Sequence, residues 1–155
     1  MVTRQEIDDF VAGRTMALVG ISADGKGFGN AAYKELKKRG YRVLPVHPRA
    51  GQVQGDACWP SLSALPERVE RLLVMVEPGQ VPGVIQEAAA CGVKQVWLQQ
   101  GAESPAGLEA CRQAGMQVID RQCILMFAEP VGSLHGFHRW VWQLIGKAPR
   151  KSPGT

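Results

Sequence analysis

Four glycines stand close together near the start of the chain, in the segment Gly20-Ile-Ser-Ala-Asp-Gly-Lys-Gly-Phe-Gly29. Glycine lets the backbone approach a phosphate closely, and the helix predicted to follow presents free N–H groups and a favourable dipole. Lys26 adds a cation to this loop. The spacing matches neither Gly-x-Gly-x-x-Gly nor a P-loop. A purely structural glycine turn is the alternative, and the position after the first predicted strand favours phosphate binding.

A second basic residue, Arg49, ends the segment Val46-His-Pro-Arg49. Folds that bind NAD normally carry Asp or Glu after the second strand, where the carboxylate holds the ribose 2′-hydroxyl. This segment has no acid. Arg49 instead favours a ribose that bears a phosphate, because Arg forms paired, charge-assisted hydrogen bonds. NADP and coenzyme A both carry such a phosphate, and the alternative is a solvent-exposed loop arginine.

Two further loops follow apolar segments. The run Val74-Met-Val-Glu-Pro78 leaves a predicted strand at a proline-marked turn, and Val96-Trp-Leu-Gln-Gln-Gly101 ends in two amides and a glycine. The amides of Gln99 and Gln100 can orient a polar ligand without ionising. Trp97 is expected in the core rather than as a stacking platform.

Candidates for catalysis are few. Cys123 follows the last predicted strand beside Arg121, so an activated thiol is one interpretation and a buried, inert cysteine is the favoured one. His135 and His138 lie three residues apart on a predicted helix, but no acidic cluster or zinc-finger cysteine pair completes a metal site. No Ser/His/Asp order is visible. These residues favour binding over catalysis.

Three junctions share one pattern, in which a predicted helix runs into a predicted strand through Gly40, Gly92 or Gly115. Glycine suits the left-handed position just past a helix end, and apolar residues that begin a buried strand follow each one. The predicted strands cover 15–21, 41–46, 71–76, 95–98 and 116–119. The predicted helices cover 3–12, 30–39, 80–91 and 104–114, and 48–65 is predicted as an irregular loop with a helical turn at 61–65.

The predicted strands lack polar alternation, as expected where helices cover both faces of a sheet. Alternating helices and strands of this kind indicate an α/β fold, a doubly wound parallel sheet of about five strands that is Rossmann-like. In such sheets ligands bind beyond the carboxyl ends of the strands, at the point where the strand order reverses. The loops 20–30, 47–51, 76–79 and 99–103 are therefore the candidate binding loops.

The chain has 155 residues, of which 45% are hydrophobic and 21% charged, which suits one packed domain and excludes a disordered chain. We assign 1–131 to the Rossmann-like domain and 132–155 to a C-terminal aromatic helix and basic tail. In that helix an apolar stripe and the pair Trp140 and Trp142 indicate either packing on the domain or a homodimer interface. Four cysteines without a Cys-x-x-Cys pair, no bilayer-length apolar segment and no signal peptide predict reduced thiols, no membrane association and a cytoplasmic protein.

The net charge of +4 is unevenly distributed, because residues 26–49 hold seven basic residues against Glu35 alone. A local anionic ligand fits this window better than nucleic acid does, since the sequence contains no known nucleic-acid-binding motif. Lys26 and Arg49 stand where ligand phosphates are expected. The remaining basic residues expected to coat the intervening helix are Lys34, Lys37, Lys38 and Arg39.

Four segments, in order and spacing, resemble the small CoA-binding proteins: Val-Gly-Ile-Ser at 19–22, Val-His-Pro-Arg at 46–49, Val-Trp-Leu-Gln-Gln-Gly at 96–101, and Val-Ile-Asp-Arg at 118–121 with Cys123. That family consists of Rossmann-fold modules similar to the CoA-binding domain of the succinyl-CoA synthetase alpha subunit. The resemblance covers about 10–125. It implies that the loop at 22–30 takes the CoA diphosphate, that Arg49 takes a CoA phosphate, and that 99–101 border the ligand.

We therefore predict a stand-alone protein that binds coenzyme A or an acyl-CoA without catalysis of its own. An NADP-dependent oxidoreductase is the alternative, and a partner-binding role of the C-terminal helix is compatible with the first prediction. The predicted ligand-binding residues are Gly20, Ile21, Ser22, Ala23, Lys26, Phe28, Gly29, Asn30, His47, Pro48, Arg49, Val76, Pro78, Gln99, Gln100 and Gly101.

Overall fold

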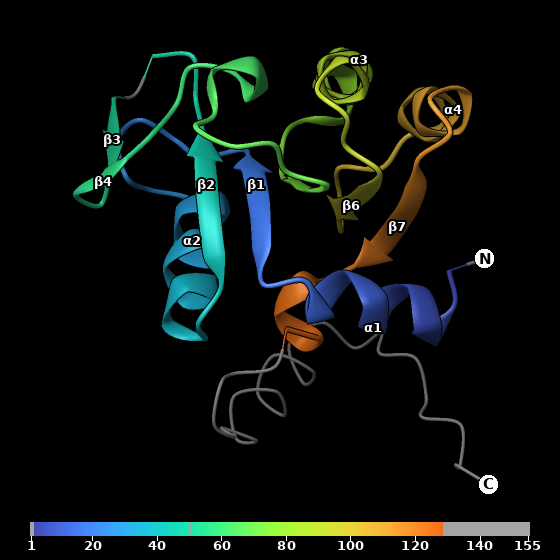
Figure 1. Cartoon of the computed structure of the whole chain (residues 1–155), viewed down its shortest axis with the longest axis horizontal. Helices are drawn as coiled ribbons and strands as arrows, with labels where there is room; N and C mark the ends of the chain where they lie inside the picture. Colours follow the sequence, from blue (N-terminus) through green and yellow to red (C-terminus); the bar gives the residue numbers. More distant parts are fainter. Residues whose placement is uncertain (1, 50, 129–155) are drawn as a thin grey trace, which may run out of the picture.

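The computed structural model describes residues 2–49 and 51–128, which form a five-stranded parallel sheet with helices on both faces (Figure 1). The strands stand in the order β2-β1-β5-β6-β7. Their bounds are Thr15–Val19 for β1, Arg42–Val46 for β2, Arg71–Val74 for β5, Gln95–Gln99 for β6 and Gln117–Gln122 for β7. The α-helices are Arg4–Ala12 (α1), Phe28–Lys38 (α2), Val81–Ala90 (α3) and Pro105–Gln113 (α4). The predicted doubly wound fold is confirmed.

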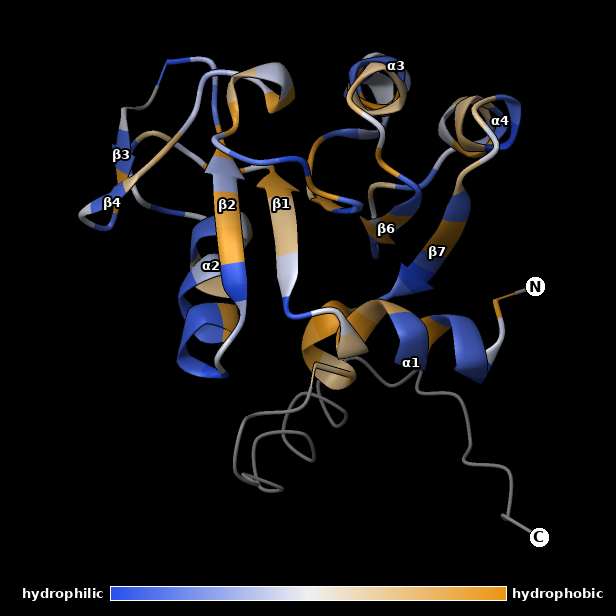
Figure 2. Ribbon diagram, in the orientation of Figure 1, coloured by the Kyte–Doolittle hydropathy of each residue, from blue (hydrophilic) through white to orange (hydrophobic). Residues whose placement is uncertain are grey.

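Successive side chains of each strand pack on opposite faces of the sheet. Met16 and Leu18 of β1 join the cluster formed with α1, α2 and the 3₁₀ helix Ile124–Met126. Ala17, between them, joins the cluster formed with α3 and α4. Figure 1 shows α3 and α4 on the side of the sheet opposite α1, and Figure 2 shows the apolar colouring of β1 and β2. Burial on both faces explains why the strands read as continuous apolar runs.

The three helix-to-strand turns are built as predicted. Gly40, Gly92 and Gly115 have φ values of 90°, 82° and 68°, in the region that side chains disfavour. Each follows a helix and precedes a strand of the parallel sheet. These turns determine how closely each strand follows the helix before it.

The long loop after β2 is more ordered than predicted. It holds a two-stranded antiparallel hairpin of β3 (Gln52–Val53) and β4 (Asp56–Ala57), followed by a 3₁₀ turn, Leu62–Ala64. Trp59 then closes part of the free edge of β2, since its N–H donates to the Pro45 carbonyl at 3.0 Å and its carbonyl accepts from the His47 N–H at 2.9 Å. Only the 3₁₀ turn was predicted, within 61–65.

One prediction about the basic helix is wrong. Lys34, Lys37 and Lys38 are exposed on α2 as expected, but Arg39 is buried. Its guanidinium donates to the carbonyls of Leu125 at 2.7 Å and Ala128 at 2.8 Å. Arg39 therefore fastens the end of α2 to the segment after β7 and does not contribute to a solvated basic surface.

The predicted C-terminal helix with Trp140 and Trp142 lies outside the described residues, so the division at residue 131 stays a prediction. Among the described residues, none of the helices has the length and apolar character needed to span a membrane.

Candidate ligand pocket at the switch point

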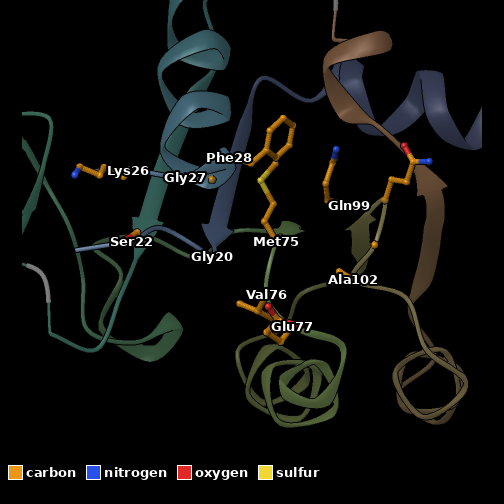
Figure 3. A pocket seen from close by; sticks show the side chains of 13 residues that line it. Gly20, Ser22, Lys26, Gly27, Phe28, Met75, Val76, Glu77, Gln99 and Ala102 are labelled. Atoms are coloured by element: carbon orange, nitrogen blue, oxygen red, sulfur yellow. The ribbon is translucent and has the colours of Figure 1, made fainter. Parts of the chain in front are cut away.

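The strand order reverses between β1 and β5. From β1 the chain moves outward to β2 and then crosses back to β5 on the other side of β1. The loops that leave β1 and β5 therefore diverge at the carboxyl edge of the sheet, which is where ligands bind in folds of this kind. A pocket of about 380 Å³ opens at this place (Figure 3). It is lined by Gly20, Ser22, Lys26, Gly27, Phe28, Gly29, Met75, Val76, Glu77, Gln99, Gln100, Gly101 and Ala102.

Two glycines bring the first turn of α2 against the end of β1. A Cβ on Gly29 would lie 2.0 Å from the Gly20 carbonyl oxygen, and a Cβ on Gly20 would lie 2.5 Å from the Met75 carbonyl oxygen. Gly20 also has a φ of 131°. Side chains at these positions would push α2 and the segment after β5 away from the β1 end, so glycine is required for the close approach.

Polar side chains fix the shape of the glycine-rich loop. The buried Asn30 carboxamide accepts from the Ser22 N–H at 2.8 Å and donates to the Ser22 carbonyl at 3.1 Å. The Asp24 carboxylate accepts from the Ser22 hydroxyl at 2.5 Å and from the Lys26 N–H at 2.8 Å. These bonds, from Ser22 first and then Lys26, lower the pKa of Asp24. These hydrogen bonds restrain the conformation of the loop.

The amino end of α2 forms one wall of the pocket and offers its backbone N–H groups to it. Gly27 occupies the cap position with a φ of 97° and supplies no side-chain acceptor for these groups. A Cβ on Gly27 would meet nothing within 4 Å, so this part of the wall is open. Uncapped N–H groups and the helix dipole favour an anion, and the exposed Lys26 supplies a positive charge beside them.

The amides after β6 form the opposite wall. The buried Gln99 accepts from the Ile124 N–H through Oε1 at 3.1 Å, which leaves its Nε2 as the donor available to the pocket. Gln100 is exposed, and Gly101 has a φ of 98° with its N–H donating to the Glu103 carboxylate at 2.8 Å. These residues present neutral hydrogen-bonding groups and no net charge of their own.

The structure brings together most of the residues predicted from the sequence and leaves others outside. Asn30 anchors the loop from behind, and Ile21 is buried in the core. His47 follows β2, where its Nδ1 accepts from the Arg49 N–H at 3.0 Å. The predicted residues that do not line this pocket are Ile21, Ala23, Asn30, His47, Pro48, Arg49 and Pro78.

Four pocket residues were not predicted: Gly27, Met75, Glu77 and Ala102. Gly27, Glu77 and Ala102 lie in three of the predicted loops, 20–30, 76–79 and 99–103, and Met75 immediately precedes the second of these. The predicted loop 47–51 does not line this pocket. These residues could have been predicted by including the residues on either side of each loop that follows the carboxyl end of a strand.

Neither Cys123 nor Trp97 lines the pocket. Cys123 is a buried free thiol, and Trp97 is fully buried in the core, as favoured from the sequence. Across 2–49 and 51–128, no group of three or more His, Cys, Asp and Glu side chains is placed to hold a metal ion. His135 and His138 lie outside that part of the chain.

The likeness to known sequences and structures is consistent along most of the chain. It is 29% identical to acetate–CoA ligase (ADP-forming) II subunit alpha of Pyrococcus furiosus over 76% of its length, and spans only 28% of that subunit. It is 25% identical to the uncharacterized protein YneT of Bacillus subtilis, covering 72% of this chain and 82% of YneT.

Solved structures share both the fold and part of the sequence. A hypothetical protein from Pyrococcus horikoshii OT3 has a TM-score of 0.74 and 27% identity, with 80% of this chain and 88% of that chain covered. A conserved hypothetical protein from Pyrococcus furiosus has a TM-score of 0.68 and 35% identity, with 72% and 97% covered. The sequence profile of the CoA binding domain matches residues 14–129, which include every strand of the sheet and the whole pocket. The chain therefore belongs to the CoA binding domain family.

Proposed function

We propose that this protein binds coenzyme A or an acyl-CoA in the pocket at the switch point of the sheet. The observation that carries the proposal is the pocket wall itself, in which the uncapped amino end of α2, Lys26 and an ordered glycine loop converge. This wall suits the diphosphate of CoA, because backbone N–H groups and one cation can share its charge without a metal ion.

The ribose phosphate and the pantetheine arm of the ligand are proposed to lie on opposite sides of that wall. Arg49 follows β2, on the outer side of β1, and is proposed to take the phosphate on the CoA ribose. The pantetheine arm then runs the other way, past β5 and toward the amides of Gln99 and Gln100. The Gln99 Nε2 can donate to an amide carbonyl of that arm.

The proposal assigns binding and no catalysis of its own. Of the described residues that line the pocket, none is a histidine or a cysteine, and the Ser22 hydroxyl donates to the Asp24 carboxylate, whose lowered pKa makes it a weak base. The ligase activity named for the Pyrococcus furiosus relative is not transferred, since this chain spans 28% of that subunit.

Isothermal titration calorimetry with CoA tests the proposal. Lys26→Ala is expected to weaken CoA binding about fivefold, equivalent to about 1 kcal/mol for one exposed cation next to a diphosphate. Lys38→Ala is the matched control, because it removes the same charge from the far end of α2. Absence of binding at millimolar CoA, or equal losses in the two variants, would contradict the proposal.

The role of Arg49 has its own test. Arg49→Ala is expected to weaken CoA about tenfold and dephospho-CoA by less than twofold, because a charge-assisted bond to phosphate contributes about 1.5 to 3 kcal/mol. Equal losses for both ligands would assign Arg49 another role. NADPH, titrated by its fluorescence, separates the alternative of an NADP-dependent oxidoreductase, and tighter binding of NADPH than of CoA would favour that alternative.

We further propose a cytoplasmic protein that binds small ligands, without nucleic acid or membrane partners, and that forms a homodimer through the C-terminal helix predicted within 132–155. Val141→Asp in the apolar stripe of this segment is expected to halve the mass measured by light scattering. An unchanged mass would remove the dimer from the proposal.

A further inference from the structure

The far end of the pocket differs in character from the wall at α2. If CoA lies as proposed, its diphosphate sits at β1 and its pantetheine arm crosses the edge of the sheet toward β6. Two strand spacings separate β1 from β6, which is about 10 Å. The thiol end of the ligand, with any acyl group on it, therefore reaches the part of the pocket formed after β5 and β6.

Apolar side chains gather at this end. Phe28 is 50% exposed and is the sole large hydrophobic residue with such exposure among residues 2–49 and 51–128. Figure 3 shows its ring in the same part of the pocket wall as the Met75 thioether. Val76 and Ala102 are further apolar residues of the lining and lie on the other side of Met75 from the Phe28 ring (Figure 3). An exposed aromatic ring at the mouth of a polar pocket gains stability when an apolar group covers it.

The loop after β5 also carries one uncompensated negative charge. Glu77 lines the pocket directly after Val76 and is exposed. Within the described part of the chain its carboxylate makes no hydrogen bond and no ion pair, whereas Lys26 lies beyond Gly27 on the opposite side of the view, with its side chain directed away from Glu77 (Figure 3). A ligand therefore meets a positive wall at its diphosphate end and a negative group at its thiol end.

We propose that this pocket selects acyl-CoA thioesters whose acyl group is short, apolar and uncharged, and that Glu77 rejects acyl groups that end in a carboxylate. The inference rests on the proposed CoA function and assigns its ligand class. Met75, which lies between the Phe28 ring and Glu77 in Figure 3, covers the acyl methylenes together with Phe28, and the Glu77 carboxylate repels a carboxylate at the end of the acyl chain.

Butyryl-CoA and succinyl-CoA provide a matched pair of probes, since both carry a four-carbon acyl chain that ends in a methyl group or a carboxylate. Calorimetry is expected to show that butyryl-CoA binds more tightly than CoA. Each covered methylene is expected to increase the affinity by up to about fourfold. Succinyl-CoA is expected to bind about five- to tenfold more weakly than butyryl-CoA, from repulsion between two carboxylates about 5 Å apart at a solvated site.

Glu77→Gln separates this charge effect from the loss of apolar contact. The variant is expected to bring the butyryl-to-succinyl ratio down to about twofold, because the amide keeps the shape and removes the repulsion. Glu70→Gln is the matched control, since Glu70 is an exposed acid immediately before β5, at the opposite end of the strand, and should leave the ratio unchanged.

The outcomes separate the inference from the function on which it rests. No binding of CoA itself would overturn the proposed function and the inference with it. Binding of CoA with equal affinities for the two acyl-CoAs, or a ratio that Glu77→Gln does not change, would overturn the inference alone.

Discussion

Replacing Gly29 with alanine tests how closely α2 approaches the end of β1. The added Cβ would lie 2.0 Å from the Gly20 carbonyl oxygen, whereas real Cβ atoms essentially never come within 3.0 Å of such a neighbour. The neighbour is backbone, so no side-chain rotation can relieve the contact. The first turn of α2 or the end of β1 must therefore shift, and both form walls of the pocket.

The loss of stability caused by Gly29→Ala can be worked out from other overpacked sites in proteins. Forced backbone shifts of this kind cost about 1 to 3 kcal/mol, and the upper part of that range applies because two backbone segments collide. Alanine in a helix recovers about 0.5 to 1 kcal/mol relative to glycine. The net loss is about 2 kcal/mol, which lowers the melting temperature of a chain of this size by about 4 to 8 °C.

Differential scanning fluorimetry measures this change, and Gly83→Ala is the matched control. Gly83 lies exposed in α3, with nothing within 4 Å of a built Cβ, so the same substitution there should raise the melting temperature by about 1 to 4 °C. The two variants are thus expected to change stability in opposite directions. A Gly29→Ala protein as stable as the Gly83→Ala protein would refute the close approach at Gly20.

Two further predictions concern buried and paired charges. Arg39→Met leaves the carbonyls of Leu125 and Ala128 without their donor and should lower the free energy of unfolding in urea by about 3 kcal/mol. Lys34→Met, on the exposed face of the same helix, should change that free energy by less than about 0.5 kcal/mol. A loss below about 1 kcal/mol for Arg39→Met would contradict the buried role of Arg39. Hydrogen bonds from Lys37 and Tyr33 lower the pKa of Asp56. The ionised Asp56 therefore stabilises the fold fully above its unfolded pKa of about 4, and this contribution is lost as the pH falls through the lower folded pKa. Asp56→Asn should lose less stability than the unchanged protein between pH 6 and about pH 3, and equal losses would contradict this pairing.

Much of the fold is predictable because its signals are local. A glycine with positive φ after each helix and an apolar run after each glycine define Gly40, Gly92 and Gly115 as turns without any tertiary information. The ends of the strands were harder. The predicted strands to Ile21 and Val76 stop instead at Val19 and Val74, because the sheet diverges at the switch point and leaves those apolar residues without a neighbouring strand.

Long-range partners explain what the sequence could not predict. From the sequence, Arg39 is predicted to be exposed like the other basic residues of its helix. Its burial depends on carbonyls 86 and 89 residues further along the chain. The β3–β4 hairpin has strands of two residues each, too short for a periodic pattern. At the pocket, the loops after β1, β5 and β6 were predicted from the topology, with Phe28 among their residues, but the placement of Met75 and Glu77 in the lining required the packing of neighbouring strand ends.

Amide chemical shifts of the ¹⁵N-labelled protein, followed by NMR as CoA is added, test the central claim most directly. We expect the largest shifts on the backbone N–H groups of 27–30, at the amino end of α2, with smaller shifts at Gln99 and Gln100. Shifts confined to the separate groove beside β2, between Tyr33 and Trp59, or no shifts at millimolar CoA, would contradict it.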